Sequence, residues 1–328
     1  MKPKELKNTL IKMVNAKMPC LVKGAPGVGK SDIINQVAEA TKHHLIISHP
    51  VVSDPTDFKG QPWVIDGKAT HLPYNELQQL IEATEPTIYF LDDLGQAPAC
   101  VQAAAMQLIL ARRVNGHKVS DSVVFIAATN RREDRAGVTG ILEPVKSRFA
   151  SILQLDVSTE DWVEWALKND MPPELIGFIY FRPELLHKPA PTSDIVNSPC
   201  PRTIAYAGKL INLGLTSVEV LAGAIGEGAA IELVGFLKIQ SDLPDLNEII
   251  DKPKIAPVPT EPATLYAVVS ALVNKADKKN VDAIFTYACR LPGDISVLLG
   301  RDLGKKDPTL FQCKARDEWA KKNGNILF

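Results

Sequence analysis

The most informative segment of the chain is Gly24-Ala25-Pro26-Gly27-Val28-Gly29-Lys30-Ser31. It matches the pattern G-x-x-x-x-G-K-[ST] in full, follows the apolar run Cys20–Lys23 and opens the amphipathic stretch Ser31–Thr41. Glycines in such a turn let backbone amides approach phosphate oxygens, and the N-terminus of the next helix adds a favourable field. These eight residues therefore predict a binding loop for ATP, with Lys30 at the β- and γ-phosphates and the Ser31 hydroxyl as a Mg²⁺ ligand.

Around this loop, short apolar runs alternate with helical stretches. The expected strands are Cys20–Lys23, Leu45–Ser48, Thr87–Asp92, Val123–Thr129 and Ile152–Leu155. Uninterrupted apolar strands are typical of a parallel sheet that is buried on both faces. Expected helices cover Ser31–Thr41 and Pro98–Arg113, and the turn pairs Asp66–Gly67 and Asn115–Gly116 predict two β-hairpin inserts. The predicted fold class is α/β, a three-layer P-loop core.

The pattern changes after about residue 156. Ser158 and Asp161 resemble a capping box that opens a helix, and helical sequence continues to Leu237 apart from a proline-rich break. The stretch Lys252–Pro262 holds four prolines in eleven residues and predicts a stiff, extended linker. We therefore expect a P-loop core over residues 1–156, a helical lid over 157–240, and a helical C-terminal extension over 241–328.

Composition excludes several classes of protein. The chain has 328 residues, a net charge of −1 and 45% hydrophobic residues, so disorder is excluded and no broad basic surface is available for DNA or an anionic membrane. The five cysteines are widely spaced and fit neither a zinc site nor a disulfide framework. With no signal peptide or membrane span in the sequence, we expect a reduced, cytoplasmic protein.

Polar residues end two of the expected strands. Asp92 and Asp93 follow the apolar run that starts at Thr87, and Asn130 follows Thr129. Asp92 fits a Mg²⁺ ligand, Asp93 a group that polarises the attacking water, and Asn130 an amide that orients this water near the γ-phosphate. Each could be an ordinary cap or turn residue if it stood alone. Downstream of a phosphate-binding loop, the three together indicate a hydrolytic site.

In this order, the three motifs resemble those of the AAA+ ATPases: GAPGVGKS is similar to Walker A, FLDD to Walker B and ATN to sensor 1. The hairpin at Asn115–Gly116 resembles the pre-sensor-1 hairpin, and the one at Asp66–Gly67 lies where the helix-2 insert clade carries its insert. The segment Ser53–Gly60 and the helix start APACVQAAAMQLIL are similar to the MoxR-like branch, which is grouped with dynein-related AAA domains. The resemblance covers roughly residues 5–235.

This resemblance implies further roles. Arg148 matches the arginine finger that reaches the γ-phosphate of a neighbouring subunit, and Arg202 matches the sensor 2 arginine of the helical lid. Arg131, Arg132 and Arg135 are competing candidates for the finger, and a structural salt bridge is the alternative for Arg148. The resemblance also implies a homo-hexameric ATPase ring that remodels or activates a protein client, a class that includes proteins with a von Willebrand factor A-type domain.

Three alternatives stay open. Asp93 stands where Walker B usually has Glu, which is one methylene longer, so the chain could be a nucleotide-switched scaffold with very slow hydrolysis. A P-loop kinase would need an acceptor site and a closing lid within one subunit. A DNA-acting AAA+ motor would concentrate a few basic residues in a ring pore, which keeps nucleic acid open as a partner. Phe58, in the expected loop Asp57–Gly60, and the two hairpin tips are the candidate partner contacts, with a structural role as the alternative for each.

Overall fold

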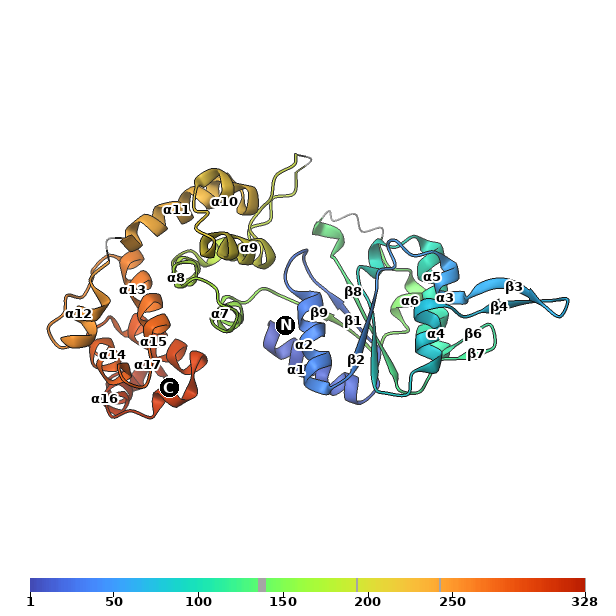
Figure 1. Ribbon diagram of the computed structural model, residues 1–328, viewed down its shortest axis with the longest axis horizontal. Helices are drawn as coiled ribbons and strands as arrows, with labels where there is room; N and C mark the ends of the chain where they lie inside the picture. The colour runs from blue at the N-terminus through green and yellow to red at the C-terminus, as the bar shows by residue number, and fades with distance from the viewer. Residues whose placement is uncertain (135–139, 193, 242, 328) are drawn as a thin grey trace. The chain divides into compact units, whose positions relative to one another are not determined.

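The computed structural model describes residues 1–134, 140–192, 194–241 and 243–327. The chain folds into two compact units, Met1–Val157 and Ser158–Phe328. Each unit is described by itself below (Figure 1). The predicted division into core, lid and extension stays a prediction.

The first unit is built on a sheet of five parallel strands. These strands are β1 (Cys20–Lys23), β2 (His44–Ser48), β5 (Thr87–Leu91), β8 (Val123–Thr129) and β9 (Ser151–Gln154), and their order across the sheet is β2-β5-β8-β1-β9. The predicted parallel α/β sheet is therefore confirmed. Because β1, β5 and β8 run the same way, the residues that follow them meet at one edge of the sheet.

Helices cover both faces of this sheet (Figure 1). One face packs against α1 (Pro3–Asn15) and α2 (Lys30–Thr41). The other packs against α3 (Pro55–Lys59), α4 (Asn75–Glu82), α5 (Ala99–Ala111) and α6 (Glu143–Lys146). Successive strand residues alternate between the two faces: Phe90 packs with the α1 and α2 layer, whereas Tyr89 packs with the α3 to α6 layer. Burial on both faces explains why the strands are uninterrupted apolar runs.

Two β-hairpins extend from the layer of α3, α4 and α5 (Figure 1). They are β3 (Gln61–Ile65) with β4 (Lys68–Leu72), and β6 (Arg113–Val114) with β7 (His117–Lys118). In the longer hairpin the turn residues Asp66 and Gly67 have φ angles of 49° and 76°, both left-handed, as tight two-residue turns require. Both predicted hairpins are confirmed.

Of the two roles expected for Phe58, the structure shows the structural one and not the partner contact. Phe58 lies in α3, a short helix that sequence analysis treated as a loop, and its side chain is 1% exposed within the hydrophobic core. Asp54 caps this helix, since its side chain accepts a hydrogen bond from the Thr56 amide at 3.0 Å. The capped turn directs Phe58 inward.

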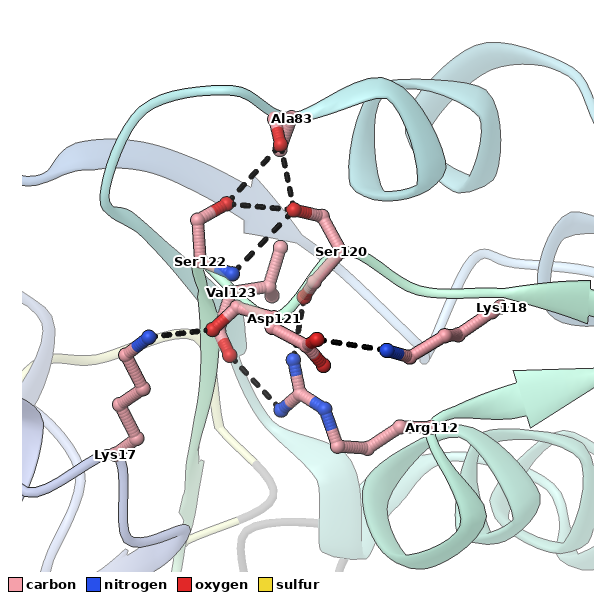
Figure 2. Close-up of polar contacts among 8 residues, drawn as sticks. All are labelled: Lys17, Ala83, Arg112, Lys118, Ser120, Asp121, Ser122 and Val123. Atoms are coloured by element: carbon pink, nitrogen blue, oxygen red, sulfur yellow. Dashed lines mark hydrogen bonds and ion pairs between the residues drawn. The ribbon is translucent and has the colours of Figure 1, made fainter.

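A group of polar side chains fixes the start of β8 to its surroundings (Figure 2). Arg112 follows α5 with a left-handed backbone, and its guanidinium donates to the carbonyl oxygens of Ser120 and Val123, at 2.9 Å for Val123. The Ser120 and Ser122 hydroxyls both donate to the carbonyl oxygen of Ala83, just after α4. The entry of β8 into the sheet is thereby fixed to the C-terminal ends of two helices.

The second unit is helical in all of its described regular structure. Its α-helices are α7 (Thr159–Lys168), α8 (Pro173–Phe181), α9 (Pro201–Asn212), α10 (Val218–Ile225), α11 (Glu227–Ser241), α12 (Leu246–Asp251), α13 (Pro262–Lys275), α14 (Val281–Ala288), α15 (Gly293–Lys306), α16 (Ala315–Lys322) and α17 (Gly324–Leu327). The Ser158 side chain accepts from the Asp161 amide at 3.3 Å, which starts α7 where the capping pattern predicts. None of the helices in the described ranges combines the length and apolar character that crossing a bilayer requires.

The prediction of an extended linker over Lys252–Pro262 is wrong for the first half of this segment. Residues 252–256 form a turn, and Ala256 is 2% exposed. Arg290 donates to the carbonyl oxygen of Ala256 at 2.6 Å, and the Tyr287 hydroxyl donates to that of Pro257 at 2.8 Å. Prolines exclude helix but leave carbonyl oxygens free to accept, so side chains near the end of α14 bind this segment to the unit.

Candidate functional site

The predicted phosphate-binding loop connects β1 to α2 in a tight turn. Gly27 and Gly29 have φ angles of 72° and 94°, which favour glycine. A Cβ on Gly24 would stand 3.1 Å from the carbonyl oxygen of Leu155, and the Gly24 amide donates to the carbonyl oxygen of Thr129 at 3.2 Å. The loop therefore starts directly beside the end of β8, at Gly24. It continues through Ala25, Pro26, Gly27, Val28 and Gly29 to the start of α2.

Lys30 is the first residue of α2, and its side chain is buried inside the loop. Lys30 as a whole is 7% exposed. The Nζ atom donates to the carbonyl oxygens of Gly24 at 3.1 Å and Ala25 at 2.9 Å, and to Oδ1 of Asn130 at 2.6 Å. The loop thus places a positive charge at the edge of the sheet where strand-end residues meet.

Ser31 and Asp92 lie next to each other although they are far apart in sequence. The Ser31 hydroxyl donates to Oδ2 of Asp92 at 2.7 Å, and Oδ1 of Asp92 accepts from the Asp93 amide at 3.0 Å. A hydroxyl and a carboxylate are the hard oxygen donors that Mg²⁺ prefers. Among the described residues no three His, Cys, Asp or Glu side chains are grouped as metal ligands. The donor set therefore fits a Mg²⁺ that takes its other ligands from water and phosphate.

Asn130 links the buried lysine to the second carboxylate. Its side chain is almost fully buried, with Oδ1 on Lys30 and Nδ2 donating to Oδ1 of Asp93 at 3.3 Å. Asp93 lies two residues after the end of β5 and has a left-handed backbone with φ 55°. The structure therefore brings together the predicted side chains of Lys30, Ser31, Asp92, Asp93 and Asn130.

Arg131, one of the competing finger candidates, is engaged within its own turn. Its Nε and Nη2 atoms donate to the two carboxylate oxygens of Asp134 at 2.9 and 2.7 Å. Burial by itself would raise the pKa of the Asp134 carboxyl, but the hydrogen bonds and charge of Arg131 outweigh it and lower the pKa. Such a bidentate pair keeps Arg131 in place. Arg135 lies outside the described residues.

Arg148 lies just after α6 and is partly exposed. Its Nη1 atom donates to the carbonyl oxygen of Pro144 at 2.6 Å, and its buried Nε atom has no hydrogen-bond partner in the described part of the chain. Among the described residues it forms no ion pair with a carboxylate, so the structural salt bridge considered from sequence is not present there. Arg202 is an exposed residue of the first turn of α9, in the second unit.

Sequence analysis missed two residues beside this site. Gln102 lies on α5 with 1% exposure, and Gly95 lies in the 3-10 turn η1 (Leu94–Gln96) after Asp93. A Cβ on Gly95 would stand 2.2 Å from Oγ1 of Thr129. The backbone of this turn therefore packs directly against the Thr129 side chain at the end of β8. The apolar stretch ACVQAAAMQLILA contains two glutamines, Gln102 and Gln107, and its sequence alone does not distinguish the buried one from the exposed one.

Comparison with known proteins assigns the segment that holds this site to a known domain family. Residues 19–149 match the family model described as AAA domain (dynein-related subfamily). Similar solved structures include the RuvB Holliday junction branch migration motor of Thermotoga maritima, with 16% identity over 82% of this chain and 81% of that chain and a TM-score of 0.41. Another is NtrX of Brucella abortus in complex with ADP, with 13% identity over 99% of this chain and 68% of that chain and a TM-score of 0.42. No curated protein is a significant match. Residues 19–149, which hold the loop and the strand-end residues of this site, therefore form an AAA domain of the dynein-related subfamily.

Proposed function

We propose that this protein binds ATP with Mg²⁺ and hydrolyses it to ADP and phosphate. One observation carries the proposal: Lys30, Ser31, Asp92, Asp93 and Asn130 form one connected group at the edge of the sheet where β1, β5 and β8 end. AAA+ proteins generally hydrolyse nucleotides, and this group contains the charge, metal donors and water-binding side chains that hydrolysis needs.

Each residue has a role in this proposal. Loop amides and Lys30 hold the β- and γ-phosphates, and Ser31 and Asp92 hold Mg²⁺, which supplies charge neutralisation between those phosphates when bound. Asn130 orients a water molecule at the γ-phosphorus, and Asp93 accepts one of its protons. The water oxygen bonds to the γ-phosphorus as the bond from that phosphorus to the bridging oxygen breaks, which leaves ADP and phosphate.

We further propose a homo-hexameric ring in which Arg148 acts on the γ-phosphate of the neighbouring subunit and Arg202 contacts nucleotide from the helical unit. The partly exposed guanidinium of Arg148, with no carboxylate partner among the described residues, supports a role outside its own subunit. The ring would remodel or activate a protein client in the cytoplasm, as MoxR-like relatives imply. A species near six times 35.8 kDa, about 215 kDa, in the presence of Mg²⁺ and a slowly hydrolysed ATP analogue would support the ring.

Phosphate release from ATP tests the catalytic proposal. Lys30→Ala should abolish nucleotide binding, whereas Asp92→Asn should retain binding and lose turnover that depends on Mg²⁺. Lys12→Ala is the matched control, because Lys12 is a lysine on α1 outside the site and this change should leave both properties intact. Equal turnover in wild type and Lys30→Ala would refute the assignment of this site. Transfer of the γ-phosphoryl group to an added acceptor instead of water would favour the kinase.

A second candidate function is a nucleotide-switched scaffold, and Asp93 is the observation that favours it. Its carboxylate is one methylene shorter than that of Glu, and it accepts from Asn130 at a long 3.3 Å. ATP would then drive assembly while hydrolysis stayed negligible. A wild-type preparation that forms the ring with ATP and releases no phosphate over hours would favour this function over the motor.

A further inference from the structure

Gln102 makes three hydrogen bonds from a fully buried position on α5. Its Nε2 atom donates to the carbonyl oxygens of Ala97 at 3.0 Å and Gly140 at 2.9 Å. Its Oε1 atom accepts from the Leu142 amide at 3.1 Å. Both amide protons and the carbonyl oxygen of one side chain are therefore used, and all of them bind main-chain groups of two other segments.

The first of these segments leads directly to the candidate site. Ala97 directly follows η1. The Gln96 amide donates to the carbonyl oxygen of Asp93 at 2.9 Å, and the Ala97 amide donates to that of Leu94 at 3.2 Å. Gly95, in the middle of η1, approaches Thr129, the residue before Asn130, too closely for any side chain. A shift of Asp93 or Asn130 therefore reaches the segment that Gln102 holds.

The second segment leads directly to Arg148. Leu142 is the residue that precedes α6, and its carbonyl oxygen accepts from the Val145 amide at 2.9 Å. The Arg148 amide then donates to the carbonyl oxygen of Val145 at 3.1 Å, and the Val145 side chain is fully buried. The start of α6 is thus set by its bond to Gln102, and the rest of the helix follows from it.

A direct contact joins the two segments as well. The Gly140 amide donates to the carbonyl oxygen of Gly95 at 3.3 Å, and a Cβ on Gly95 would also stand 3.3 Å from Cγ1 of Ile141. Gln102 closes this junction from the α5 side. One buried amide side chain therefore connects the end of β5, where the carboxylates lie, to the short helix that precedes Arg148.

We propose that Gln102 is a positioning residue that couples the state of a subunit's own nucleotide site to the placement of Arg148. Nucleotide contacts at Asp93 and Asn130 shift η1, Gln102 transmits the shift to residues 140–142, and α6 moves with them. In a ring, this coupling would let the nucleotide bound by one subunit control hydrolysis in the next. That last consequence rests on the proposed function, whereas the coupling inside one subunit does not.

No other side chain of similar size reproduces these bonds. Leu fills the space but leaves two carbonyl oxygens and one amide unpaired, and Glu keeps an acceptor for the Leu142 amide while losing both donors. Gln107 offers the matched control, because it is an exposed glutamine on the same helix. We therefore compare Gln102→Leu and Gln102→Glu with Gln107→Leu in the full-length chain, after checking that each variant unfolds cooperatively.

Two measurements test the coupling. The first is amide hydrogen exchange over residues 140–149 with and without ADP, which needs no ring. The second is turnover in mixtures with Asp92→Asn, which should bind nucleotide without turning it over and whose Arg148 is intact. Because a misplacement of about 1 Å can cost about 10²-fold in rate, we expect turnover of Gln102→Leu to fall about 10- to 100-fold. Addition of Asp92→Asn should restore it, as it should restore Arg148→Ala.

The expected result is that Gln102→Leu binds ADP within about 2-fold of wild type, shows no change in amide exchange over residues 140–149 when ADP binds, and regains turnover in the mixture. Gln107→Leu should match wild type in every respect. A Gln102→Leu variant that keeps the exchange response would overturn the coupling. So would joint loss of ADP binding in Gln102→Leu and Gln102→Glu, which would make Gln102 part of the general support of the site. Wild-type turnover in Arg148→Ala would instead remove the trans role of Arg148, and the exchange measurement would still decide on Gln102.

Discussion

The length of the carboxylate side chain at position 93 should limit hydrolysis, and Asp93→Glu tests this directly. Oδ1 of Asp93 lies 3.3 Å from Nδ2 of Asn130, at the long end for a hydrogen bond, and its backbone is held at φ 55°. One more methylene moves the carboxylate outward by about 1.5 Å, the length of a carbon–carbon bond. Since about 1 Å of misplacement can cost about 10²-fold in rate, we expect turnover to rise about 10- to 100-fold. This corresponds to about 1.4–2.7 kcal/mol in the activation barrier.

The assay is steady-state phosphate release at saturating ATP and Mg²⁺, with nucleotide affinity measured in parallel. Asp93→Asn is the control, because it keeps the size of the side chain and removes the ability to accept a proton. Its turnover should fall about 10²- to 10⁴-fold below wild type while nucleotide affinity stays within about 2-fold. If Asp93→Glu binds nucleotide normally and turns over no faster than wild type, the reach of the carboxylate does not limit hydrolysis and this reasoning is refuted.

Three further predictions concern stability. Phe58→Ala should destabilise the first unit by about 3–5 kcal/mol in urea unfolding, because its ring is 1% exposed; a loss below about 1 kcal/mol would contradict its place in the core. Gly95→Ala should cost about 1–3 kcal/mol in thermal unfolding, because its Cβ would stand 2.2 Å from Oγ1 of Thr129; an unchanged Tm would show that the junction yields. Burial raises the pKa of the Asp302 carboxyl above its ordinary value of 3.8, against the opposing hydrogen bond from Tyr180. The stability that Asp302 contributes is therefore complete below about pH 3.8 and is lost as pH rises through its folded pKa, so Asp302→Asn should flatten this part of the stability profile in denaturant unfolding at a series of pH values.

Much of the nucleotide site could be predicted because its signals are local. The loop Gly24–Ser31 fixes its own turn through glycines at positive φ angles, and its neighbouring strand and helix are set by short apolar and amphipathic patterns. The turn pairs Asp66–Gly67 and Asn115–Gly116 likewise need only their own backbone preferences. In these places the residues that determine a structure are also the residues that adopt it.

The wrong predictions come from segments whose structure depends on distant partners. Lys252–Pro262 contains the prolines of an extended linker, but Arg290 and Tyr287 bind its carbonyl oxygens from the end of α14. Phe58 follows a short polar stretch that reads as a loop, and only its packing against the core shows which way it points. Composition over ten residues carries no information about such contacts.

Local patterns along the chain predict the phosphate-binding loop, the five strands of the parallel sheet, the two hairpins, and the acids and amide at the strand ends. Tertiary packing is needed to join Asn130 to Lys30 and Asp93, and to bring Gln102 between η1 and the segment leading to Arg148. The physical reason is that backbone preferences and periodic burial act between near neighbours and are written in short patterns. Hydrogen bonds between side chains and remote main-chain groups depend on which strands become adjacent, and that order exists only once the chain has folded.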